Sequence, residues 1–213
     1  MIKAFVISYN RLTLLKEICK EIAIRGAEPI IVDNNSDYEP LREWLSVCPY
    51  ETVILPQNIG HRCIWGSGVI EKYANGERFI ITDPDLDISG VPFDMLEVLD
   101  RGLNKYHQYD KCGLSLRIDD LPKHAKLNDV RRIEGKYWKK PLDSLYFKAE
   151  TDTTLALYQK HIRDYTLSGI RTNKPYTAVH IPWYYDKLED LPEDERYYFT
   201  TANNSSSGKH RIE

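Results

Sequence analysis

The sequence predicts an α/β domain in which a mainly parallel central sheet is flanked by helices. Three observations lead to this fold class. Short apolar runs alternate with helix-like stretches over residues 1–83, which is typical of βαβ units. Between the runs, apolar residues recur at helical spacing. The chain has 213 residues, of which 42% are hydrophobic, enough for one domain with a sizeable core.

The first half of the chain alternates regularly between the two kinds of element. Strands are expected at Ile2–Ser8, Pro29–Asp33, Thr52–Leu55 and Arg78–Asp83. The intervening helical faces are Leu12, Leu15, Ile18, Cys19 and Ile22, then Leu41, Trp44, Leu45 and Cys48, then the stretch Ile64–Tyr73. Gly26 stands where the first of these helices is expected to end.

The pattern changes after Asp87. One more helix is expected over residues 93–106, and strands are expected over 112–118, 144–158 and 177–181. Residues 119–142 are basic and lack apolar periodicity, which predicts a long mobile loop. Residues 203–213 form a polar, Ser-rich tail with almost no core residues.

Composition excludes several classes of partner. The net charge is −3 and the isoelectric point is about 6.1, so neither nucleic acid nor an anionic membrane surface is an expected partner. No stretch is long and apolar enough for a transmembrane segment, and the start of the chain lacks the pattern of a signal peptide. The four cysteines are scattered and form no CxxC pair. Reduced thiols and a cytoplasmic location are therefore expected.

Polar residues follow each predicted strand of the first half. In an open α/β sheet, ligands bind beyond the carboxyl ends of the strands. The four polar segments at these ends are Ser8–Arg11, Asp33–Ser36, Gln57–Arg62 and Asp83–Asp85. We expect them to converge on one crevice.

The pair Asp83 and Asp85 directly follows the buried run Phe79–Ile81. Placing two carboxylates side by side at the end of a buried strand is costly, and a divalent cation relieves that cost. Oxygen ligands favour Mg²⁺ or Mn²⁺, which also bridge diphosphate oxygens. The chain has neither a Gly-rich dinucleotide motif nor a P-loop, so a metal is expected to hold the phosphates. The alternative is a solvated acidic turn that caps the next helix.

These segments, in this order, resemble the glycosyltransferases of the GT-A fold, especially family-2-like members. The resemblance covers residues 1 to 88 and rests on the runs Val6–Arg11, Ile31–Ser36, Asn58–Gly60 and Ile80–Asp85. It implies that Asp83 contacts both ribose and metal, with Asp85 as the direct metal ligand. It further implies a donor-nucleotide site that contains Ser8, Tyr9, Arg11, Asp33, Asn58 and Arg62, in which Arg62 approaches the base or the diphosphate.

Candidate catalytic residues lie in the second half, where the resemblance is weaker. A carboxylate is the usual general base for an acceptor hydroxyl, and Asp152 is the first candidate, followed by Glu150. The alternative for Asp152 is a helix cap. The resemblance implies a late histidine or acid in the metal sphere, for which His180 is the candidate. A core histidine is the alternative.

The function expected from these residues is metal-dependent glycosyl transfer of the hexosyltransferase type. A UDP- or GDP-linked sugar is the expected donor, and a glycan or another hydroxyl compound the expected acceptor. The family-2 likeness implies inversion at the transferred carbon. Residues 1–88 would then bind the nucleotide sugar and residues 89–202 the acceptor, with 203–213 as the tail. Two alternatives are a non-catalytic protein that binds nucleotide sugars or glycans, and a sugar-nucleotide pyrophosphorylase.

Overall fold

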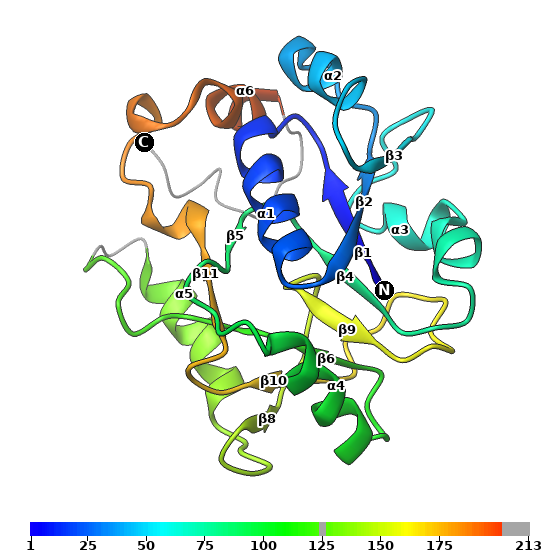
Figure 1. Ribbon diagram of the computed structural model, residues 1–213. Helices are drawn as coiled ribbons and strands as arrows, with labels where there is room; N and C mark the ends of the chain where they lie inside the picture. Colours follow the sequence, from blue (N-terminus) through cyan, green and yellow to red (C-terminus); the bar gives the residue numbers. More distant parts are fainter. Residues whose placement is uncertain (124–126, 202–213) are drawn as a thin grey trace.

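A computed structural model describes residues 1–123 and 127–201 (Figure 1). Within them, the main sheet has eight strands in the order β3-β2-β1-β4-β9-β6-β10-β8. These strands are β1 Ile2–Ser8, β2 Ala27–Asp33, β3 Glu51–Ile54, β4 Phe79–Thr82, β6 Lys111–Gly113, β8 Tyr146–Lys148, β9 Ala156–Tyr158 and β10 Gly169–Thr172. The helices are α1 Leu12–Ile24, α2 Glu39–Leu45, α3 Cys63–Gly66, α4 Met95–Lys105, α5 Asn128–Glu134 and α6 Glu193–Thr201.

The structure confirms the α/β class, but the sheet is mixed. Strands β3, β2, β1 and β4 are parallel, as the sequence predicts for the first half. Strand β9 runs antiparallel to both β4 and β6, and β8 runs antiparallel to β10. Each antiparallel pair of this sheet therefore includes a strand of the second half, where the strands of the sheet are only three or four residues long.

Strand β1 lies at the centre of the parallel half and is buried on both faces. Ala4 and Val6 pack into one apolar cluster together with residues of α1 and α4. Phe5 and Ile7 pack into a second cluster on the opposite face with residues of α3. A strand with helices on both faces needs apolar side chains at every position, which explains the continuous apolar run.

A second sheet of three strands brings the late part of the chain to the end of β4. Its order is β5 (Leu86–Asp87), β11 (Thr177–His180) and β7 (Ser115–Leu116). In the antiparallel pair, His180 lies opposite Leu86. The backbone N–H of Ile181 donates to the carbonyl of Asp85 at 3.0 Å. This small sheet therefore sets His180 beside Asp85.

Three sequence-based predictions of local structure were wrong. Instead of a loop, residues 119–142 contain α5 and the 3₁₀ helix Gly135–Trp138, although 124–126 lie outside the described residues. Within α5, Glu134 forms a buried ion pair with Arg171 at 2.9 Å, a long-range contact that local periodicity does not reveal. The predicted helix 64–73 is interrupted at Gly68, which has a φ of +75°. The predicted strand 144–158 is two strands, β8 and β9, joined by a loop.

The remaining features of the described residues are ordinary. All four cysteines are free thiols, and Cys19, Cys63 and Cys112 are buried. None of the described helices has the length and apolar character that crossing a membrane requires. The predicted tail 203–213 lies outside the described residues.

Candidate active site

The carboxyl ends of β1, β2 and β4 meet at one edge of the sheet. Ser8 and Asp33, the last residues of β1 and β2, are in register. Asp83 follows the last residue of β4, which is the other neighbour of β1. The convergence of Ser8, Asp33 and Asp83 on this edge therefore follows from the order of the parallel strands.

Asp33 is almost fully buried, and both of its carboxylate oxygens accept hydrogen bonds from the chain. Oδ1 accepts from the hydroxyls of Ser8 at 2.9 Å and Ser36 at 2.6 Å, and Oδ2 accepts from the backbone N–H of Ser36 at 2.9 Å. Ser8 is itself fully buried. These residues hold the turn after β2 against the end of β1.

The loop with Asn58 is tied to the turn after β2. The Asn34 amide donates to Oδ1 of Asn58 at 2.8 Å and to the carbonyl of Gly60 at 3.1 Å. The backbone N–H of Ile59 donates to Oδ1 of Asn34 at 2.9 Å. Asn58 is exposed, as is Arg62 just beyond the loop. Asn34 therefore fixes the segment that presents Arg62 to solvent.

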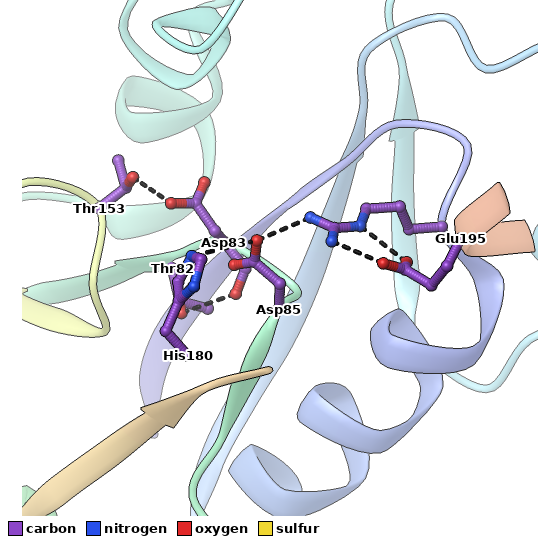
Figure 2. Close-up of polar contacts among 7 residues, drawn as sticks. Thr82, Asp83, Asp85, Thr153, His180 and Glu195 are labelled. Carbon is purple, nitrogen blue, oxygen red and sulfur yellow. Dashed lines mark hydrogen bonds and ion pairs between the residues drawn. The ribbon is translucent and has the colours of Figure 1, made fainter. Parts of the chain in front are cut away.

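Arg11 lies in a buried ion-pair network and is only 3% exposed. Its Nη1 donates to Oδ2 of Asp85 at 2.7 Å, while Nε and Nη2 donate to the two carboxylate oxygens of Glu195 at 2.8 and 2.7 Å. Figure 2 shows Asp85 and Glu195 approaching this guanidinium from opposite sides. The Tyr198 ring lies 4.2 Å from Arg11, and Tyr9 packs edge-on against Tyr198 at 6.5 Å.

Asp85 and His180 are close neighbours. Nε2 of His180 lies 3.5 Å from Oδ2 of Asp85, and the imidazole ring packs 4.5 Å from the ring of Trp183. Burial raises the pKa of Asp85, but the charges of His180 and Arg11 lower it by more, so the net shift is downward. Asp85 is therefore an ionised, well-compensated carboxylate.

Asp83 has a different environment from Asp85. Its side chain is half-buried and accepts a hydrogen bond from the Thr153 hydroxyl (Figure 2), and its backbone N–H donates to the Thr153 carbonyl at 3.1 Å. Burial and then the charge of Asp85 raise the pKa of Asp83 to about 8, with a smaller effect from Asp152. Asp83 is thus poorly compensated for its charge, as residues at functional sites often are.

Asp152 lies near Asp83, at the start of the loop that leads into β9. It is exposed, and its Oδ1 accepts a hydrogen bond from the Tyr165 hydroxyl at 3.0 Å. Its backbone carbonyl accepts one from Nζ of Lys111 at 3.1 Å. No helix follows that Asp152 would cap, because the chain continues into β9. The carboxylate of Glu150 is exposed, and the carbonyl of Glu150 accepts from Nε of Arg171 at 2.8 Å.

The site includes residues that the sequence analysis missed. Glu195 and Lys111 are fully buried and charged, and Thr153 and Tyr165 contact the two candidate carboxylates. Glu195 lies 184 positions from Arg11, and Thr153 lies 70 positions from Asp83. No local pattern connects residues so far apart. The only available signal was the cluster of acids at the start of α6.

Asp83 fits a divalent cation better than the other predicted ligands. The described residues contain no group of three or more His, Cys, Asp and Glu side chains arranged to hold a metal ion. A cation would offset both the burial and the repulsion from Asp85 that raise the pKa of Asp83. Asp85 is bonded to Arg11 through Oδ2, which also faces His180. Asp83 is therefore the side chain that would hold Mn²⁺ or Mg²⁺, and diphosphate oxygens would supply further ligands.

Comparison with known proteins leaves the function to be argued from these residues, since no protein-family model and no curated protein matches the sequence.

Proposed function

We propose that this protein is a metal-dependent glycosyltransferase of the GT-A type that uses a nucleotide-diphosphate sugar as donor. The observation that carries the proposal is the position of Asp83, which directly follows β4 and lies close to Asp85 and beside Thr153. Burial and the charge of Asp85 raise the pKa of Asp83 to about 8, which supports the proposal. Asp83 lies at the carboxyl edge of the parallel half of the mixed sheet, and α/β proteins bind ligands at such an edge. A structural acid at that place would be expected to have a compensating cation, as Asp85 has in Arg11.

The donor nucleotide would lie across the ends of β1 and β2. Tyr9 is half-buried, while Asn58 and Arg62 are exposed, so these three side chains can contact a ligand directly. Ser8 and Asp33 are buried and bonded to each other, so they would shape the edge from beneath. Arg62 would approach the diphosphate, because a guanidinium matches phosphate geometry.

Asp152 is the proposed general base. It accepts the proton of the acceptor hydroxyl as that oxygen bonds to the anomeric carbon of the donor sugar. The bond from the anomeric carbon to the diphosphate oxygen breaks with its electron pair, and the nucleoside diphosphate leaves. Attack from the face opposite the leaving group inverts this carbon. A divalent cation at Asp83 would supply charge stabilisation for the leaving diphosphate.

The test is release of nucleoside diphosphate from UDP- and GDP-linked sugars, with Mn²⁺ and with EDTA. We expect donors to raise the melting temperature with Mn²⁺ and to bind only weakly in EDTA. Asp83→Asn should abolish both the release of nucleoside diphosphate and the rise in melting temperature with Mn²⁺. Asp87→Asn is the matched control, because Asp87 is an exposed neighbour in the same acidic segment that accepts only a turn hydrogen bond from Ser89. Full nucleotide affinity in EDTA would refute metal dependence.

A second candidate is binding of nucleotide sugars without transfer. The observation that favours it is the ion pair between Asp85 and Arg11, which compensates the carboxylate that the family resemblance makes the direct metal ligand. Donor binding without any release of nucleoside diphosphate, over a panel of sugar acceptors, would support this candidate and exclude transfer.

A further inference from the structure

Tyr165 contacts two proposed site residues from opposite halves of the chain. Its hydroxyl donates to Oδ1 of Asp152 at 3.0 Å. Its ring lies beneath the guanidinium of Arg62, whose central carbon is 4.3 Å from the ring centroid. Asp152 and Arg62 are both exposed, and exposed side chains of this kind lose conformational entropy when a ligand fixes them. Tyr165 restrains both before a ligand arrives.

Tyr165 is itself held in place. The Trp65 ring packs edge-on against it at 5.3 Å, and Nζ of the fully buried Lys111 lies 5.7 Å from its centroid. Lys111 also donates to the backbone carbonyl of Asp152. The carboxylate and the backbone carbonyl of Asp152 each accept a hydrogen bond from a neighbouring side chain, so this segment has little freedom to rotate.

We propose that Tyr165 is the positioning residue of the active site, orienting the base Asp152 through its hydroxyl and the donor-binding Arg62 through its ring. This rests on the proposed glycosyl transfer. Burial and then the charge of Asp152 raise the pKa of Tyr165 to about 12, so the hydroxyl stays protonated and continues to donate at neutral pH. The two contacts use different parts of one side chain, and substitution can separate them.

The decisive experiment compares Tyr165→Phe with Tyr165→Leu in steady-state transfer from the donor that the unaltered protein uses. Phenylalanine keeps the ring under Arg62 and loses only the hydroxyl, so kcat should fall about tenfold while the KM for donor stays within about twofold. Leucine also removes the ring, so the KM for donor should rise about two- to fivefold. This fold-change corresponds to the free energy of an exposed cation–π contact.

A double substitution tests whether the change in KM passes through Arg62. If it does, Tyr165→Leu should add nothing to the KM for donor once Arg62→Ala is present, since contacts that act as a unit are not additive. Tyr176→Phe is the matched control. The Tyr176 hydroxyl donates to Asp94 at 2.9 Å in an exposed pair of the same chemistry, and its loss should leave kcat and KM unchanged.

The outcomes separate this inference from the proposed function. The role of Tyr165 is overturned, and the proposed function is kept, if the unaltered protein transfers sugar but Tyr165→Phe has full kcat. An unchanged KM for donor in Tyr165→Leu has the same meaning. If Tyr165→Phe lowers the melting temperature as well as kcat, Tyr165 has only a structural role, and the inference is also overturned. Absence of transfer by the unaltered protein overturns the proposed function and this inference with it.

Discussion

Arg11 and Glu195 form a buried bidentate ion pair although 184 positions of the chain separate them, with N–O distances of 2.8 and 2.7 Å. The pair joins the end of β1 to α6, which lies beside the start of α1 (Figure 1). Next to Glu195, Asp194 accepts hydrogen bonds from the backbone N–H and the hydroxyl of Thr13 at 2.6 and 3.0 Å. Helix α6 therefore docks mainly through two acids, with Phe199 as its buried apolar residue.

Replacing Glu195 by Ala should lower the free energy of unfolding by about 3 kcal/mol, because the change removes one partner of a buried charge pair. Asp85 still compensates Arg11, so we expect the lower end of the range for such pairs. Urea unfolding gives the measurement. Glu189→Ala is the control, since Glu189 pairs with Lys187 at 3.4 Å and both side chains are well exposed. A cost no larger than that of the control would contradict the importance of the buried pair.

Asp83→Asn should stabilise the protein increasingly as the pH rises from the ordinary pKa of 3.8 towards about 8, and should leave its stability unchanged in stronger acid. The pKa of Asp83 rises from the ordinary 3.8 to about 8 on folding, so the folded state binds more protons than the unfolded state between those values. The contribution of Asp83 is therefore fully present in acid and is lost as the pH rises towards about 8. Asparagine cannot ionise, so the advantage of the variant should grow over this window.

Urea unfolding at several pH values in EDTA measures this difference, with Asp87→Asn as the control. Adding Mn²⁺ should stabilise the unaltered protein and leave Asp83→Asn unaffected, because only the native carboxylate can bind the cation. A difference in stability that does not change with pH would show that Asp83 has no perturbed ionisation.

His180→Ala separates packing from metal ligation. The ring contact with Trp183 at 4.5 Å and the approach to Asp85 lead us to expect a loss of about 1–3 kcal/mol in unfolding free energy. Mn²⁺ affinity, measured by calorimetry on the same variant, should change little. A loss of Mn²⁺ affinity of about ten- to a hundredfold would instead confirm the sequence-based prediction that His180 is a ligand.

Lys111→Met should change how stability depends on alkaline pH. Burial lowers the pKa of Lys111 from the ordinary 10.5 to about 8, so between these values the unfolded state binds more protons than the folded state. Stability of the unaltered protein should therefore rise relative to Lys111→Met as the pH increases through this window, by about 1.4 kcal/mol per pH unit at most. The same change at exposed Lys160 controls for loss of the charge itself. A constant difference would contradict the lowered pKa.

The sequence predicted the parallel half of the fold because its strands are marked locally. Ile2–Ser8 and the face of α1 around Leu15 and Ile18 have apolar patterns that only one kind of element satisfies, and both elements are confirmed. Most strands of the second half have only two or three residues, too short to give a period. Helix α5 is stabilised by the distant pair of Glu134 with Arg171, so its existence could not be predicted from its own residues.

The contrast between local patterns and distant contacts applies to the site as well. The position of Asp83 and Asp85 at the sheet edge was predictable, because both come directly after the buried parallel strand β4. The opposite pKa shifts of the two carboxylates were not predictable, because they depend on Thr153 and on Arg11, which Glu195 holds, and all three come from other parts of the chain. Tyr165 was equally hidden, since one tyrosine in a polar loop has no distinguishing pattern. The position after a buried strand singled out the carboxylates, and only three-dimensional contacts identified their partners.

The ion pair between Arg11 and Glu195 of α6 limits the order in which this protein can fold during its synthesis on the ribosome. Chains emerge from the N-terminus at about 5–20 residues per second, so Arg11 and Asp85 are synthesised well before Glu195. Strand β4 likewise has no partner on one side until its antiparallel neighbour β9, residues 156–158, has been synthesised. Until then, the nascent chain has an exposed strand edge and a guanidinium with only one acid. Completion of the site therefore has to wait until α6 has been synthesised.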